Sequence, residues 1–415
     1  MSRKIALTGG LLADPALNAP ALGTLLIEDD RIVATGQIDV PADAEVIDAN
    51  GMVIAPGLVD LGVFRTDKPA FHFGGITRAA LMPDQNPPLD HPAQVRFAAQ
   101  SGKPDFWVHP IAAATRRLEG KELAEIALMK EAGAKAIATG RRWIGDSGSM
   151  LRVLQYGAML DLVVCTHAED GGLVGQAVAT AGEMATRLGL PAAPARAEAL
   201  AIARDVALAE LAGARLHLRN VTTIEGLRLV RAAKERGLPV TAGVTPAYFM
   251  LSDLAMAEFR TFARLSPPLR SEADRQAVLS AIADGVVDVI SSGHDPRGPE
   301  DKRLPFADAE PGMAGAETLL PLTLNLVRDG VISISRAFEL LAANPARLLG
   351  VNAGRLEVGM EADIAVVDAE RPWIVDSDKM AASAGNTPFD KQPVQGRVLA
   401  LFKGGAQVRT KQPPS

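Results

Sequence analysis

Side chains that could bind a metal ion or move a proton stand near the ends of several strand-like runs in this sequence. They are His167, Glu169, Asp170, His217, His294 and Asp295. Imidazole and carboxylate groups are common ligands of divalent metals. A single histidine beside carboxylates is still a poor metal site, so we expect His167 to be a structural histidine that is hydrogen-bonded near its strand end. We expect His217 to pack or cap rather than bind.

The elements that must position these side chains alternate between strand and helix. From Val53 onward, short buried strands are followed by alanine-rich helical stretches. Examples are a strand at 161–166 before a helix near 173–188, a strand at 215–220 before a helix at 224–236, and a strand at 287–291. Repeated βα units of this kind predict an α/β protein with a (β/α)8 TIM-like barrel and its helices outside.

Both ends of the sequence have β character instead. Short β-like runs and turn signals alternate over residues 1–50, and β-like runs return at 354–367 and 396–407. We therefore expect a small, discontinuous β-sandwich domain formed by residues 1–52 and 354–415, which flanks a barrel at 53–353.

The composition excludes several classes of protein. The chain has 415 residues, a formal net charge of -6 and 22% charged residues, which offers no field for a polyanion, so no nucleic acid is expected as a partner. The single cysteine, Cys165, cannot form an internal disulfide, and this favours the reducing cytoplasm. We see neither the apolar stretch of a signal peptide nor a run long enough to span a membrane.

Short motifs in a fixed order resemble those of the dihydroorotase family of cyclic amidohydrolases. They lie at 55–60, 82–88, 167–170, 221–223, 244–246, 267–270, 315–318, 344–347, 359–363 and 386–389. The resemblance implies an amidohydrolase barrel that opens or closes the ring of dihydroorotate in pyrimidine biosynthesis. It also implies one or two divalent metals at the C-terminal mouth of the barrel, which activate a water, and an aspartate that moves the proton.

The resemblance identifies the former active-site positions one by one. They are Gly62, Phe64, Lys135, His167, Asn220 and Gly293. The first strand of the family ends in a His-x-His pair, and Gly62 and Phe64 stand at those places, where neither can bind a metal. Asn220 stands where a further ligand histidine is expected. Gly293 stands where the family has the aspartate that is both ligand and proton shuttle.

Of these positions, one keeps its ligand clearly and one is ambiguous. His167 matches a ligand histidine, and Lys135 stands where some members have a carboxylated lysine that bridges the metals. Carboxylation needs a neutral amine, so without metals we expect Lys135 to be an ordinary cation. Because even lost second-layer partners weaken metal binding, the lost ligands should abolish a binuclear site. We expect no metal, and His167 with Lys135 as the ligands if one binds.

The segment after the first barrel strand is also shorter than in the family. Only a few residues separate Thr66 from Gly74. We therefore expect the barrel to lack its first outer helix, and another surface to cover the exposed strand.

Three hypotheses follow from the resemblance. The first is a non-catalytic dihydroorotase-like protein that acts as a structural partner of the aspartate transcarbamoylase catalytic chain or associates with itself, with no cofactor. The second is an active, zinc-dependent cyclic amidohydrolase with a mononuclear site. Its residual pocket would consist of Lys135, His167, His294 and Asp295. The third is a sensor of small anions that uses Arg141, Arg142 and Arg264.

Overall fold

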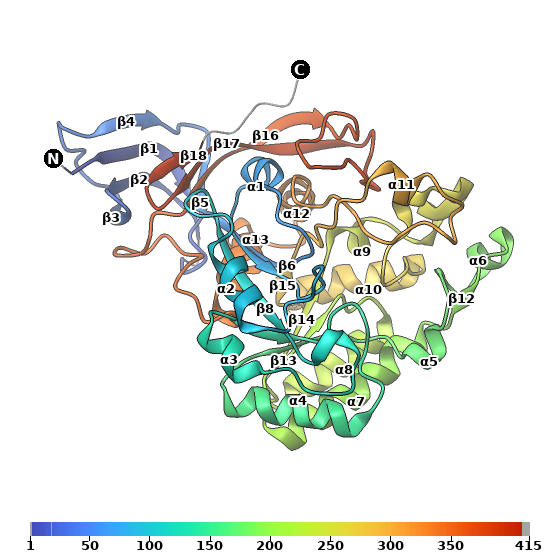
Figure 1. Cartoon of the computed structure of the whole chain (residues 1–415). Coiled ribbons are helices and arrows are strands. Elements are labelled where there is room, and N and C mark those ends of the chain that lie inside the picture. Colours follow the sequence, from blue (N-terminus) through green and yellow to red (C-terminus); the bar gives the residue numbers. More distant parts are fainter. Residues whose placement is uncertain (1, 18, 409–415) are drawn as a thin grey trace.

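The centre of the fold is a barrel-like sheet of eight parallel strands that pair in chain order (Figure 1). The structure is a computed structural model, and it describes residues 2–17 and 19–408. The strands are β6 (Leu58–Val63), β7 (Ile76–Leu81), β8 (Trp107–Ala113), β9 (Ala136–Ala138), β10 (Val164–His167), β13 (Leu216–Arg219), β14 (Val240–Val244) and β15 (Val289–Ile290). Most of their side chains are buried on both faces, as is typical of parallel sheets covered by helices. The predicted α/β barrel is confirmed.

Helices follow the strands and lie outside them, as α4, α7 and α8 do in Figure 1. The longer ones are α2 (Pro92–Gln100), α3 (Ile126–Glu131), α4 (Ser147–Met159), α7 (Arg196–Ala212), α8 (Ile224–Glu235), α10 (Glu272–Ala283) and α12 (Leu319–Arg328). The shorter ones are α9 (Pro246–Met250), α11 (Pro299–Lys302), α13 (Ile334–Phe338) and α14 (Asn344–Leu348). Side-chain caps begin several of them. The hydroxyls of Thr223 and Ser271, for example, accept backbone N–H bonds at the starts of α8 and α10.

The first outer helix is present in shortened form, which corrects the expectation that it is missing. Helix α1 (Lys68–Gly74) lies between β6 and β7 and packs against β7 and β17. Its Phe71 side chain is fully buried. Gly75, with φ of 77°, ends the helix in the left-handed conformation. The segment is too short for a long helix but long enough for about two turns, which pack against β7.

The helix expected near 173–188 is also corrected, because the chain is broken there into short elements. These are α5 (Gly171–Val174), β11 (Ala179–Thr180), α6 (Glu183–Leu188) and β12 (Ala192–Ala193). Gly175 has φ of 50° directly after α5. A positive φ of this kind interrupts a right-handed helix, although the alanine-rich composition of the segment favours one.

The seam between the first and last barrel strands is closed by a buried carboxylate. Asp60 on β6 accepts the backbone N–H of Ser292 at 2.8 Å and also accepts its hydroxyl. Nearby, the backbone N–H of Phe64 donates to the carbonyl of His294 at 2.9 Å. Burial raises the pKa of the Asp60 carboxyl, although hydrogen bonds from Ser292 oppose the shift.

The two ends of the chain form a second sheet of eight strands. It runs in the order β18 (Ala406–Val408), β17 (Pro393–Lys403), β16 (Ile364–Ile374), β5 (Val53–Pro56), β1 (Lys4–Leu12), β2 (Ala21–Glu28) and β3 (Arg31–Gly36), with β4 (Glu45–Asp48) paired to β1. This sheet has a hydrophobic core of its own, which includes Ile5, Ile27 and Phe402. Strand β5 belongs to it, although the expected boundary assigned residues from 53 onward to the barrel. Residues 409–415 of the expected segment 354–415 lie outside the described residues.

No helix in the described ranges combines the length and the apolar character needed to cross a lipid bilayer.

Candidate functional site at the barrel mouth

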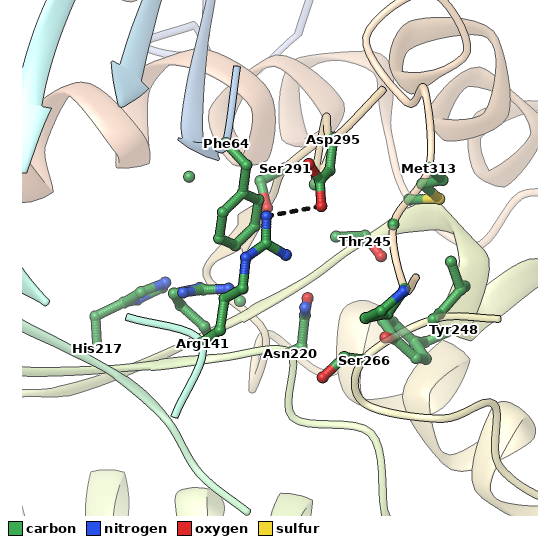
Figure 2. Close-up of a pocket in the computed structure, with 17 residues that line it drawn as sticks. Phe64, Arg141, His217, Asn220, Thr245, Tyr248, Ser266, Ser291, Asp295 and Met313 are labelled. Carbon is green, nitrogen blue, oxygen red and sulfur yellow. Dashed lines mark ion pairs between the residues drawn. The ribbon is translucent and has the colours of Figure 1, made fainter. Parts of the chain in front are cut away.

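Four of the positions that the resemblance matches to the family's active site meet at the C-terminal ends of the barrel strands. Gly62, Phe64, Asn220 and Gly293 line one cavity, together with Asp295 (Figure 2). They lie at or after the ends of three strands, β6, β13 and β15, and parallel strands bring those ends to one face of a barrel. The cavity has a volume of about 40 Å³, which is room for roughly three water molecules. Side chains therefore fill most of the mouth.

Phe64 and two arginines do most of that filling. The guanidinium carbon of Arg141 lies 3.7 Å from the centre of the Phe64 ring, and that of Arg219 lies 5.1 Å from it. Figure 2 shows Arg141 beside the ring, with its guanidinium directed to Asp295. An aromatic face attracts cations at such distances. The position that matches a metal ligand of the family thus holds an aromatic ring, and two guanidinium groups lie over that ring.

Asp295 is neutralised by ion pairs within the mouth. Its Oδ2 atom lies 2.7 Å from Nη2 of Arg141 and 3.1 Å from Nη2 of Arg297. The side chain of Asp295 is 8% exposed. Two short charge-assisted contacts hold this carboxylate, so it is not available to act as a metal ligand or a proton shuttle without breaking them.

His167 lies beside the mouth, in a neighbouring depression that also contains Arg142 and Trp143 and has a volume of about 490 Å³. Its Nε2 atom lies 3.3 Å from Oε2 of Glu169. Its Nδ1 atom is buried and has no hydrogen-bond partner in the described part of the chain. The contact places a carboxylate beside the imidazole at the end of β10.

The partner of His167 is committed to a buried arginine. Oε1 of Glu169 lies 2.7 Å from Nη2 of Arg270. Burial alone would raise the pKa of the Glu169 carboxyl, but Arg270 and then His167 outweigh it and lower that pKa to about 2. Glu169 is therefore a stable anion at neutral pH, and its charge is balanced by Arg270.

His294 is adjacent to the mouth in sequence but faces away from the residues that line it. Its ring packs against Phe71 of α1 with centroids 5.7 Å apart. Its Nδ1 accepts the backbone N–H of Ala316 at 3.3 Å, and its Nε2 lies 3.8 Å from Oδ2 of Asp67. His294 thus supports the packing of α1 behind the barrel.

Lys135 lies at the opposite end of the barrel. It precedes β9, and its backbone N–H donates to the carbonyl of Pro110. The position at the mouth end of β9 is taken by Thr139 and Gly140. The structure therefore does not bring Lys135, His167, His294 and Asp295 together, and the residual pocket built from them is corrected.

The donor set at the mouth does not fit a zinc ion. Zinc takes three or more nitrogen, sulfur or carboxylate ligands at about 2 Å. Across residues 2–17 and 19–408, no group of three or more histidine, cysteine, aspartate or glutamate side chains could hold a metal. Gly62 has φ of 104°, so a histidine restored at that position would also be strained.

Arg219 and Thr245 belong to the site but were not among the predicted residues. Arg219 follows His217 by two positions on β13, and strand alternation places both side chains on the interior face. That alternation was the available signal for Arg219. Thr245, after β14, lines the cavity, and its buried hydroxyl oxygen has no hydrogen-bond partner among the described residues.

Comparisons with known proteins agree with this architecture. The family described as "Dihydro-orotase-like" matches residues 51–226. The chain is 39% identical to a dihydroorotase of Syntrophotalea carbinolica, over 97% of this chain and 98% of that protein, and 36% identical to one of Acetivibrio thermocellus, over 97% and 98%. Among solved structures, the L-hydantoinase (dihydropyrimidinase) from Arthrobacter aurescens has a TM-score of 0.88 at 24% identity and covers 100% of this chain and 98% of its own. The likeness to this solved structure is a likeness of fold.

Proposed function

The chain belongs to the dihydroorotase family of cyclic amidohydrolases, and from that premise we propose that it is a non-catalytic member of this pyrimidine-pathway family. The observation that carries the proposal is the packed mouth, where Phe64 replaces a metal ligand and the guanidinium groups of Arg141 and Arg219 lie over its ring. Hydrolysis of a cyclic amide in this family depends on an activated water and a proton shuttle. Neither Gly293 nor the ion-paired Asp295 supplies the shuttle.

The size of the cavity supports the same reading. Small-molecule sites usually enclose about 300–1,000 Å³, whereas the space among Phe64, Asn220 and Gly293 is about 40 Å³. A cyclic amide would have to displace Arg141 from both Phe64 and Asp295 before it could reach the strand ends. The packing of the mouth thus opposes substrate entry as well as chemistry.

We further propose that the protein serves in the cytoplasm as a structural partner of the aspartate transcarbamoylase catalytic chain, alone or as a self-associated assembly. The resemblance to inactive dihydroorotase homologues motivates the choice of partner. The outer helices expose large apolar side chains, which a bound partner would cover. Phe97 on α2 and Met159 on α4 are each 79% exposed, and Leu211 on α7 is 70% exposed.

Metal content and turnover test the absence of catalysis. After incubation of the purified protein with zinc and removal of the excess, we expect far less than one zinc per chain and no cyclisation of carbamoyl aspartate above background. The reason is that the mouth lacks a set of three ligands. A catalytically active dihydroorotase treated in the same way is the control. One zinc per chain together with enzymatic turnover would establish the alternative, an active zinc-dependent cyclic amidohydrolase.

Complex formation tests the partner. Mixed with the aspartate transcarbamoylase catalytic chain from the same host, the protein is expected to elute as a stoichiometric complex in size-exclusion chromatography with light scattering. If the outer helices form the interface, Phe97→Ser should weaken the complex by roughly tenfold or more, as expected for an aromatic anchor. Leu22→Ser, at an exposed apolar position of the terminal sheet, is the matched control. Separate elution of the two proteins at micromolar concentration would contradict the proposed partnership.

A further inference from the structure

A second cavity lies at the other end of the barrel from the mouth, where the amino-terminal ends of β7, β8 and β9 meet the loop at 350–352. Its volume is about 440 Å³. Its lining is rich in positive and polar side chains and includes a single carboxylate. The charged and aromatic residues are Arg31, Arg78, Lys103, Trp107, His109, Lys135 and Glu361. We call this space the basal cavity.

Part of its positive charge is balanced by carboxylates of the terminal sheet. Nε of Arg78 lies 2.7 Å from Oδ2 of Asp363, and its Nη2 lies 2.5 Å from Oε2 of Glu361. Lys403 on β17 pairs with the same two carboxylates, at 2.9 Å from Oδ1 of Asp363 and in a short contact with Glu361. These four charges, three of them buried and Glu361 partly exposed, join the barrel to the terminal sheet. Because Glu361 and Asp363 are both paired with Arg78 and Lys403, neither carboxylate is free to pair with the other cations of the cavity.

Arg31, at the edge of the cavity, pairs with Asp30 at 3.5 Å, which leaves the cations Lys103 and Lys135. Neither has an ion pair with a carboxylate in the described part of the chain. The Lys103 ammonium lies 4.9 Å from the centre of the Trp107 ring, where Arg78 and Lys403 also lie, at 4.5 Å and 4.1 Å. The ring thus helps to hold several like charges close together, although the chain as a whole carries a net charge of -6. Like charges gathered in this way favour a bound anion.

His109 adds an unsatisfied polar group to the same space. The side chain lines the basal cavity and is 6% exposed, and its buried Nε2 atom has no hydrogen-bond partner among the described residues. Burial, and then the charges of Arg78 and Lys135, lower the pKa of His109 to about 3. The imidazole is therefore neutral at pH 7, and a neutral imidazole can donate one hydrogen bond. A buried polar atom usually has a partner in the functional state of a protein.

We propose that the basal cavity binds a small phosphate-bearing anion, held by the ammonium groups of Lys103 and Lys135 and by a hydrogen bond from His109. The volume lies in the usual range for small-molecule sites, about 300–1,000 Å³. Phosphoryl oxygens accept several charge-assisted hydrogen bonds at once, which suits lysines that have no carboxylate partner. This function is separate from the proposed structural role and does not depend on it, since it needs only the residues of the basal cavity.

Isothermal titration calorimetry of the full chain tests the site, with inorganic pyrophosphate and ATP as separate probes at low ionic strength. We expect saturable binding of pyrophosphate, weakened as salt is raised. We also expect a rise in the unfolding temperature with ligand concentration, because the ligand binds the folded state. Binding of ATP but not pyrophosphate would mean that the site takes a nucleoside phosphate. Absence of binding by both probes at millimolar concentration would overturn the proposal.

Variants distinguish the basal cavity from other positive surfaces. Lys103→Met and Lys135→Met should each weaken binding by roughly tenfold or more, since a hydrogen bond to a charged group contributes on that order. Neither lysine has an ion pair to lose, so both variants should fold, as checked by their melting curves. Lys121→Met, at an exposed lysine elsewhere, and Arg141→Met, at the mouth, are the controls that should bind normally. Loss of binding in Arg141→Met with retention in both lysine variants would place the anion at the mouth and refute the basal site.

Discussion

Replacing Arg270 with methionine is expected to lower the free energy of unfolding by about 3–5 kcal/mol, the usual cost of removing one partner from a buried ionic network. The Arg270 side chain is 4% exposed, and its Nη2 atom lies 2.7 Å from Glu169 and 3.3 Å from Glu198. Its other nitrogens donate to the hydroxyls of Thr222 and Thr180 at 2.9 and 3.0 Å. Methionine keeps much of the volume but leaves two buried carboxylates without a countercharge.

Chemical denaturation at pH 7 measures this effect, with Arg231→Met as the control. Arg231 pairs with Asp284 at 2.8 Å, but the two side chains are 46% and 50% exposed. Surface pairs of that kind contribute about 0–1 kcal/mol. Adding Glu198→Gln to Arg270→Met should recover part of the loss, because one uncompensated charge is removed. Equal small losses for Arg270→Met and Arg231→Met would contradict a buried network that stabilises the fold.

The convergence of former ligand positions at the mouth could be predicted from the sequence. Gly62, Asn220 and Gly293 end or follow predicted strands, and the ends of parallel strands meet at one face. What fills the mouth could not be predicted in the same way. Arg141 lies in a loop after β9, and its contact with the Phe64 ring depends on the path of that loop in three dimensions. Local periodicity carries no information about such a contact.

The position of Lys135 shows a second limit of the sequence. Strand β9 has only three residues, Ala136–Ala138, so a shift of a few residues moves a side chain from one end of the barrel to the other. A motif match can identify a residue without fixing its register on the strand. The same residue then takes part in a different environment, the basal cavity, with Lys103 and His109.

Acid sensitivity between pH 6.5 and 4.5 is the second large effect that we expect. His217 is buried in the barrel interior, with Nδ1 3.0 Å from the Thr241 hydroxyl. Burial, followed by the charges of Arg219 and Lys234, lowers the pKa of His217 to about 3 from its ordinary value of 6.5. Below pH 6.5 the unfolded chain gains a proton that the folded chain does not accept until about pH 3. The stabilisation is therefore complete above pH 6.5 and is lost as the pH falls, by about 1.4 kcal/mol per pH unit for one histidine.

His217→Gln should make the free energy of unfolding less dependent on pH in this interval, by roughly 2–3 kcal/mol between pH 6.5 and 4.5. Denaturation curves at several pH values provide the measurement. Only the change of the free energy of unfolding with pH is compared, so a constant loss of stability from the missing hydrogen bond to Thr241 does not affect the result. His109, whose pKa is also lowered to about 3, should keep part of the dependence in the variant. Glu169, with a pKa of about 2, contributes mainly below this interval, where its unfolded form begins to gain a proton. His91→Gln, at an exposed position, is the control and should follow the pH dependence of the parent protein. An unchanged pH dependence in His217→Gln would contradict the prediction. It would mean that His217 gains its proton in the folded barrel near its ordinary pKa, and that the interior around β13 accepts this charge despite the burial.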